Sequence, residues 1–136
     1  VFVENKPGTL AEITGILGAN DIDMCALSVA DTERYGILRL IVNNPQKAED
    51  ALKAAGFKVS LTDVIAIAVS HKPGGLSEAL KYVAQAGIAV EYMYAFVSPK
   101  ADTAYVILRV QDNQKAILAL QQGGIPVIRG EEVYGK

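Results

Sequence analysis

Two short turns hold the residues of this chain that are best suited to bind a small charged molecule. The first turn reads Asn-Lys-Pro-Gly-Thr-Leu over residues 5–10, and the second reads His-Lys-Pro-Gly-Gly-Leu over residues 71–76. Each turn follows a short β-like run and precedes an amphipathic helical pattern. The free N–H groups and the positive dipole end at a helix start attract anions. Both turns are therefore candidate anion-binding positions, and no catalytic group stands beside either of them in the sequence.

Other kinds of site are poorly supported by the residue types. His71 is the only histidine and Cys25 the only cysteine, so no metal-ligand cluster can form around them. His71 can be a ligand contact, a pH-dependent contact or an exposed turn residue. Cys25 stands in a β-like run with no histidine near it in sequence, which favours a small buried residue over a nucleophile. We expect no metal, no cofactor and no catalytic residue.

Known motifs of enzyme chemistry are also missing from the sequence. It has no phosphate-binding loop, no dinucleotide-binding glycine fingerprint and no Ser-His-Asp set. An acylphosphatase-like enzyme would need an arginine in the turn after the first strand, and neither turn has one. A non-catalytic role is the better interpretation.

Composition narrows the range of partners. Of the 136 residues 51% are hydrophobic and 21% are charged, with a net charge of −2 and scattered lysines and arginines. This balance argues against nucleic acid and anionic membrane as partners. The apolar run 64–69 is far shorter than the ~20 residues that cross a bilayer. A single cysteine fits a reducing cytoplasm. Because Val1 stands inside a β-like run, we expect the native chain to begin upstream, and a removed leader stays open.

The sequence repeats itself. A shift of 66 aligns Lys6-Pro7-Gly8 with Lys72-Pro73-Gly74, and a shift of 68 later aligns Gln46-Lys47-Ala48 with Gln114-Lys115-Ala116. The identities fall at turn and core positions in the same order, which indicates an internal duplication. The join stands at 61–64, so we predict one domain over residues 1–63 and a second over residues 64–136.

The residue pattern of each repeat predicts strands and helices in the order β-α-β-β-α-β. In the first repeat we expect a capping box between Thr9 and Glu12, a helical stripe beginning at Leu10, and a second helix starting at Asn44-Pro45. Pro126 places the last strand at a sheet edge. The predicted strands cover residues 1–3, 22–30, 37–42, 57–61, 64–69, 88–96, 105–110 and 125–128. This order is the α+β, ferredoxin-like arrangement, with both helices of a repeat on one face of an antiparallel sheet.

With this arrangement and these two turns, the chain resembles a tandem pair of ACT domains. The residues that carry the resemblance are the two Lys-Pro-Gly turns, the stretch Asp21-Ile22-Asp23-Met24, and Ala86-Gly87-Ile88-Ala89-Val90. Residues 23–30 look like the second strand of acetolactate synthase regulatory subunits. The resemblance implies a small-molecule sensor, usually for amino acids, which regulates a metabolic enzyme. It also implies that two sheets join side by side into one sheet of eight strands, and that the chain forms a homodimer.

The resemblance further implies where a ligand lies, namely between the first turn of one domain and the second strand of the other. Carried over, Asn5 matches the family's amide, Gly8 its close-approach glycine, and Asp23 a polar position that is usually asparagine. In the second repeat His71 and Ala89 take the places of Asn5 and Asp23, so we expect unequal occupancy in favour of the first repeat. The candidate ligand-binding residues are Asn5, Pro7, Gly8, Thr9, Leu10, Asp23, Met24, His71, Gly74, Gly75, Leu76, Val90 and Tyr92.

We expect the Gly8 and Thr9 N–H groups to bind a ligand carboxylate, and Asn5 and Asp23 to bind its ammonium. The alternative is a regulatory subunit without a ligand, which acts through protein contacts on a metabolic enzyme.

Overall fold

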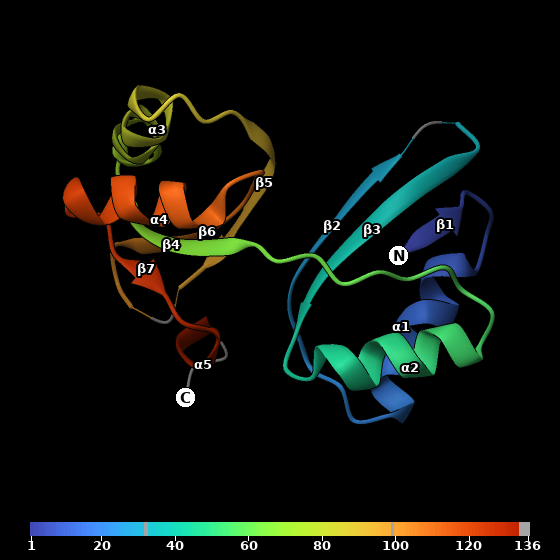
Figure 1. Ribbon diagram of the computed structural model, residues 1–136. Helices are drawn as coiled ribbons and strands as arrows, with labels where there is room; N and C mark the ends of the chain where they lie inside the picture. Colours follow the sequence, from blue (N-terminus) through green and yellow to red (C-terminus); the bar gives the residue numbers. More distant parts are fainter. Residues whose placement is uncertain (32, 99, 134–136) are drawn as a thin grey trace. The chain divides into compact units, whose positions relative to one another are not determined.

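The computed structural model describes residues 1–31, 33–98 and 100–133. The chain divides into two compact units, Val1–Thr62 and Asp63–Lys136, each with its own sheet and its own apolar core (Figure 1).

The first unit is an α+β fold with an antiparallel sheet. Its strands pair in the order β1-β3-β2. Its elements are β1 (Phe2–Glu4), α1 (Thr9–Ala19), β2 (Met24–Asp31), β3 (Tyr35–Val42) and α2 (Pro45–Ala54). The strand predicted over 57–61 is reduced to one isolated bridge, between Phe2 and Lys58. β1 is only three residues long and pairs with this segment through Phe2 alone, so no ladder develops.

The second unit repeats the fold with a fourth strand. Its strands pair in the antiparallel order β5-β6-β4-β7. Its elements are β4 (Ile65–Ser70), α3 (Gly75–Gln85), β5 (Val90–Val97), β6 (Thr103–Val110), α4 (Asn113–Gln122), β7 (Val127–Ile128) and α5 (Gly130–Val133). β7 pairs only with β4, which confirms the edge position that Pro126 predicts. The short helix α5 has no counterpart among the predicted elements.

The structure confirms the duplication in the two main helices and two long strands of each unit. α1 and α3 have 11 residues each, α2 and α4 have 10, and the strands β2, β3, β5 and β6 have 8. Both edge strands also carry an irregularity at the same place, at Cys25 in β2 and at Glu91 in β5. The expectation that the two sheets join into one sheet of eight strands stays a prediction, because it depends on how the units pair.

The core of the first unit lies between its sheet and the helices α1 and α2. Ile13, Leu17 and Leu52 are fully buried there, facing Leu38 of β3. The inward stripe of α1 runs through Thr9, Ile13 and Leu17. The prediction that Leu10 begins this stripe is wrong, because the side chain one position earlier points inward and Leu10 is 43% exposed.

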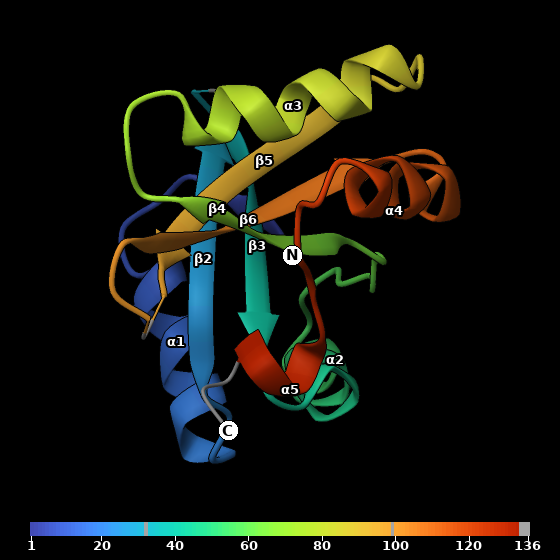
Figure 2. The same cartoon turned by 90° about the vertical axis from the view of Figure 1, so that its left-hand side faces the viewer.

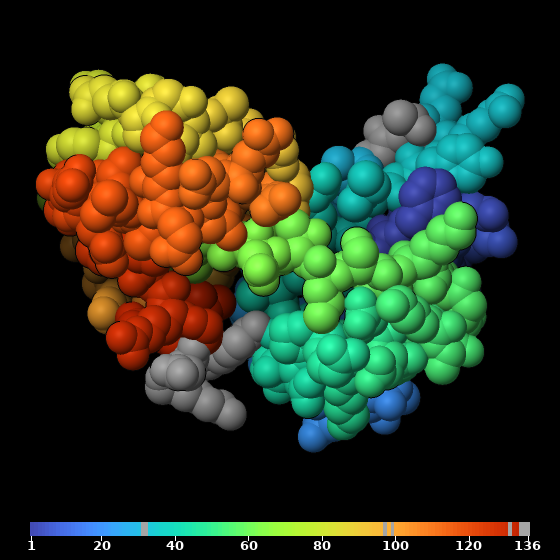
Figure 3. Space-filling model, viewed as in Figure 1, coloured from blue at the N-terminus to red at the C-terminus, as the bar shows by residue number. Residues whose placement is uncertain are grey.

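The core of the second unit is larger and lies under α3 and α4. Figure 2 shows both helices over the same sheet, and in Figure 3 their side chains pack against one another on the face in view. Val83 of α3 and Leu120 of α4 meet Leu108 of β6 in this core. The Tyr82 ring lies so close to Gly123 that a Cβ there would come within 2.6 Å of it. Among the described residues, no helix is long and apolar enough to cross a membrane.

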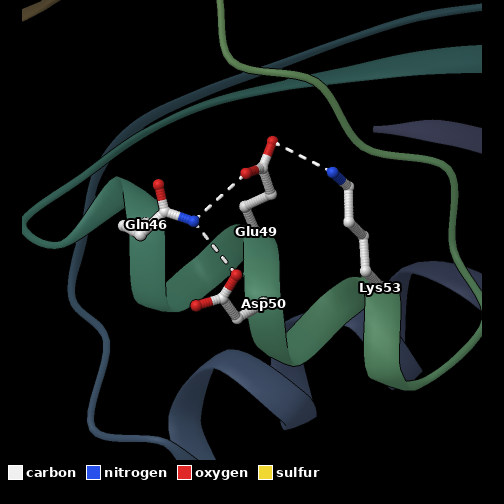
Figure 4. A network of polar contacts seen from close by, with 4 residues as sticks. All are labelled: Gln46, Glu49, Asp50 and Lys53. Carbon is white, nitrogen blue, oxygen red and sulfur yellow. Dashed lines mark hydrogen bonds and ion pairs between the residues drawn. The ribbon is translucent and has the colours of Figure 1, made fainter.

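Local chemistry explains where α2 begins. The Asn44 side chain accepts a hydrogen bond from the Lys47 N–H at 3.1 Å, and Pro45 takes the first helical position, where a missing N–H costs nothing. On the exposed face the Gln46 amide donates to Glu49 and Asp50, and Glu49 pairs with Lys53 at 3.5 Å (Figure 4). Spacings of three and four residues put these side chains on one helix face.

Candidate ligand-binding turns

The two Lys-Pro-Gly turns have the same backbone geometry. Gly8 and Gly74 are the residues before α1 and α3, and both adopt the left-handed conformation, with φ of 91° and 89°. A side chain at either position would be strained, which explains the glycines. The N–H groups of Gly8 and Gly74 have no acceptor within the part of the chain that the structure describes. Each turn therefore presents an available donor at the positive end of an 11-residue helix.

The same contact anchors both turns to the neighbouring hairpin. The backbone N–H of Asn5 donates to the Arg34 carbonyl, and the N–H of His71 donates to the Asp102 carbonyl, both at 2.8 Å. In the first turn the Asn5 side chain also donates to the Glu33 carbonyl at 3.2 Å. The Asn5 amide oxygen can still accept a bond from a ligand ammonium. His71 is exposed.

The predicted capping box is wrong. Thr9 is the first residue inside α1, and the residue before the helix, Gly8, has no side chain that could cap it. The Thr9 hydroxyl is buried and has no hydrogen-bond partner among the described residues. The Thr9 N–H already donates to the Lys6 carbonyl at 3.3 Å, so Gly8 provides the more accessible donor. In the second turn, a Cβ at Gly75 would come within 2.1 Å of the Ser70 carbonyl, which excludes a threonine there.

The first turn and the start of β2 lie at opposite ends of the first sheet. Glu4, just before the turn, pairs with Tyr35 at the start of β3, whereas Met24 pairs with Val42 at its end. Eight residues of β3 separate these ends by about 23 Å. The structure therefore does not bring Asn5 and Gly8 together with Asp23 inside the first unit. A site that uses both groups needs a second unit to complete it.

The second unit is arranged in the same way. Val90 pairs with Val110 at the end of β6, far from the turn at Gly74, and Tyr92 follows one register step further. Leu76 and Val90 pack partly against the core of the second unit, and Met24 packs partly against that of the first. Leu10, by contrast, is open to contact. The candidate residues thus form one group at each end of each unit.

Comparison with known proteins decides the family. A family model described as "ACT domain pair" matches residues 1–129. The chain belongs to the ACT domain family. A search of curated protein sequences found no match.

Solved structures show a similar fold. Protein BT0572 from Bacteroides thetaiotaomicron is 36% identical, with a TM-score of 0.92 over 99% of this chain and 92% of that chain. The regulatory subunit of aspartate kinase from Thermus thermophilus is 16% identical, with a TM-score of 0.66 over 90% of this chain and 88% of that chain. That of Thermus flavus is 13% identical, with a TM-score of 0.58 over 91% and 88%. The two kinase subunits share the fold with this ACT pair.

The remaining charged and reactive groups are weak candidates. Lys6 pairs with Glu4 at 3.4 Å, and both side chains are more than 60% exposed, so the pair is worth little. Within the described ranges, no group of three or more His, Cys, Asp or Glu side chains could hold a metal ion. Burial raises the pKa of the Cys25 thiol to about 11; a backbone hydrogen bond opposes this rise, and the Asp23 charge adds a smaller rise of its own. Such a thiol is a poor nucleophile at neutral pH.

Sequence reasoning missed two features of the ACT edge strands. The Asp23 N–H donates to the Asn43 side chain at 3.0 Å, and the Asn43 N–H donates back to the Asp23 carbonyl at 3.1 Å, which fixes the backbone at the start of β2. The second feature is the bulge that sets Glu91 beside Arg109. Both features are contacts between segments that are far apart in the sequence, and the pattern of a single strand does not report such contacts.

Proposed function

We propose that this ACT pair is a non-catalytic regulatory protein that binds an amino acid between two units, near the Gly8 and Gly74 turns. The observation that carries the proposal is the pair of left-handed glycines, each with an available N–H at a helix start. The N–H group can donate a hydrogen bond to a ligand carboxylate, and the Asn5 amide oxygen or the Asp23 carboxylate can accept one from a ligand ammonium. Charge-assisted bonds of this kind contribute ~1.5–3 kcal/mol each.

The unit geometry supports a crossed arrangement of these groups. β2 and β5 each lie at one edge of their sheets. If two such edges lie antiparallel, the end of one stands beside the start of the other. In a pairing of first with second units, Gly8 and Asn5 would then share a site with Val90 and Tyr92. His71 and Gly74 would share the other site with Asp23 and Met24. The same pairing between chains would produce a homodimer.

A thermal-shift screen of the twenty amino acids tests the proposal. A ligand at ~100 times its dissociation constant should add ~2.7 kcal/mol to the stability of the folded state. We expect one or a few amino acids to raise the melting temperature and the others to have no effect. A flat screen, repeated with purines and short organic acids, would reject the sensor function.

Asp23→Ala assigns the ammonium contact. We expect this variant to lose the part of the ligand-induced shift that comes from the site containing Asp23, and to keep the melting temperature of the unliganded protein, because Asp23 is exposed. Asp50→Ala, on the exposed face of α2, is the matched control and should keep the full ligand-induced shift. An undiminished ligand-induced shift in Asp23→Ala would remove Asp23 from the site.

One observation favours a second function, that of a ligand-free assembly subunit. The Asn5 amide donates to the neighbouring hairpin and the Thr9 N–H donates inside the turn, as both would in a purely structural turn. The two functions differ in the screen, because an assembly subunit responds to no small molecule.

A further inference from the structure

Residues 61–64 form the segment that connects the two units, and hydrogen bonds hold this connecting segment where it reaches the second unit. Asp63 is the first residue of that unit and follows the exposed Leu61 and Thr62. Its carbonyl accepts a hydrogen bond from the Arg109 guanidinium at 3.1 Å and another from the Asn113 amide at 3.4 Å. Arg109 stands on β6 and Asn113 opens α4. Two elements of the second unit therefore hold one backbone carbonyl of the connecting segment.

The same guanidinium also binds the edge strand. Arg109 Nε lies 3.3 Å from a Glu91 carboxylate oxygen, while its Nη1 donates to Asp63. Glu91 is the extra residue of the bulge in β5, between Val90 and Tyr92. A guanidinium presents its donors in a rigid fork, so the carboxylate and the carbonyl fix its orientation together. Arg109 thus joins the start of the edge strand to the connecting segment.

This arrangement is not required by the fold, because the duplicated unit lacks it. The counterparts of Glu91, Arg109 and Asn113 in the first repeat are Cys25, Ile41 and Pro45, at shifts of 66, 68 and 68. There the bulge residue makes only a weak contact, from the Cys25 thiol to the Ile41 carbonyl at 3.4 Å. A bulge and strand pairing of the same kind form in the first unit with uncharged residues at all three positions. The charged set of the second unit is therefore not needed for the bulge or for the strand pairing.

We propose that Arg109 is a latch that holds the connecting segment on the second unit, and that Glu91 keeps the latch closed. With the latch closed, the free part of the connection ends at Asp63. When Glu91 or Arg109 is withdrawn, the segment around Leu61 and Asp63 is released from the second unit. The Asn113 oxygen is buried without a partner among the described residues, so the closed state leaves one acceptor unsatisfied. The latch goes beyond the proposed function and holds whether or not a ligand binds.

Limited proteolysis with chymotrypsin measures the latch, because Leu61 is a cleavage position in the connecting segment and is 53% exposed. Cleavage of a transiently opened segment follows the population of its open form. Loss of hydrogen bonds to a charged group should raise the rate of cleavage after Leu61 about tenfold in Arg109→Gln. Glu91→Gln keeps the arginine and should give a smaller rise at the same position. The fragments are quantified by mass spectrometry.

Controls separate a latch from general destabilisation. Lys53→Gln removes the Glu49–Lys53 pair on α2, which does not touch the connecting segment, and should leave cleavage after Leu61 unchanged. If Arg109 only stabilised the second unit, cleavage at Tyr94 and Leu118 would rise together with cleavage at Leu61. That result, or unchanged cleavage in both Arg109→Gln and Glu91→Gln, would overturn the latch. If Arg109→Gln does not fold, Glu91→Gln and Asn113→Ala decide by the same readout.

Discussion

The Thr9 hydroxyl is buried at a position where it makes no hydrogen bond with the described residues. Its oxygen is buried at the first turn of α1 and finds no partner among the described residues. A buried hydroxyl without a hydrogen bond costs about 1–3 kcal/mol, whereas its methyl group packs as any apolar group does. At the residue scale, Thr9 contributes to the stability of α1 through the packing of its buried side chain and not through its hydroxyl.

Thr9→Val therefore should stabilise the first unit by about 1 kcal/mol, because valine keeps the shape and removes the unsatisfied oxygen. A working capping box predicts the opposite sign, a loss of about 1 kcal/mol. Urea unfolding of the variant and the parent protein distinguishes the two. Thr14→Val is the control, since the Thr14 hydroxyl donates to the Leu10 and Ala11 carbonyls within the same helix. Destabilisation by Thr9→Val would mean that the hydroxyl has a partner in solution.

The Cys25 thiol makes the stability of the folded state depend on pH in the alkaline range. Burial raises the pKa of its thiol in the folded state to about 11, from an ordinary value of 9.0. The folded protein thus holds this proton more tightly than the unfolded chain does. The resulting stability is fully present below pH 9 and is lost as the pH rises from 9 toward 11. We expect Cys25→Ala to show a smaller loss of stability over this interval than the parent protein.

Alkylation offers an independent measurement of the same thiol. Iodoacetamide reacts with the thiolate, so at pH 8 the labelling of Cys25 should be at least about tenfold slower than that of a free thiol such as glutathione. In urea the difference should disappear, because unfolding exposes the thiol. Equal labelling rates in the folded protein and in glutathione would contradict the raised pKa.

At the scale of the element, the start of α2 depends on one side chain. Asn44→Ala should destabilise the first unit by about 1 kcal/mol, because the Lys47 N–H loses its acceptor. Gln46→Ala is the matched control two positions later on the exposed surface (Figure 4), and it should change stability by less than about 0.5 kcal/mol. Urea unfolding measures both. Equal effects from the two variants would show that the cap contributes nothing beyond ordinary surface contacts.

The elements themselves were largely predictable because their patterns are local. Asn44-Pro45 marks a helix start by chemistry that acts within one turn, and the inward positions of β3 follow strand alternation. The strand at 57–61 failed because its existence depends on how much of β1 is available to pair, which is not a local property. The capping box failed because a left-handed Gly8 moves the helix start one residue earlier than the threonine pattern implies.

At the scale of the whole molecule, the candidate site was predictable as a set of residues and not as a geometry. The two turns carry a motif that is visible in the sequence, and the duplication shows that they are equivalent. Residues 5–10 and Asp23 are close in sequence order, yet the path of α1 carries the chain back along the sheet and leaves them at opposite ends. Which turn meets which strand depends on pairing between units, and no pattern within one repeat reports it.

A double-mutant cycle identifies the pairing. If first and second units pair through antiparallel edges, Asp23 and His71 contact one ligand while Asn5 contacts another. The effects of Asp23→Ala and His71→Ala on affinity for the amino acid found in the thermal-shift screen should then be non-additive, with a coupling energy of about 0.5–3 kcal/mol. Asp23→Ala and Asn5→Ala should be additive within about 0.5 kcal/mol. Isothermal titration of the single and double variants supplies these numbers. Coupling of Asp23 with Asn5 instead would indicate that two first units pair with each other, which requires two chains and replaces the crossed arrangement.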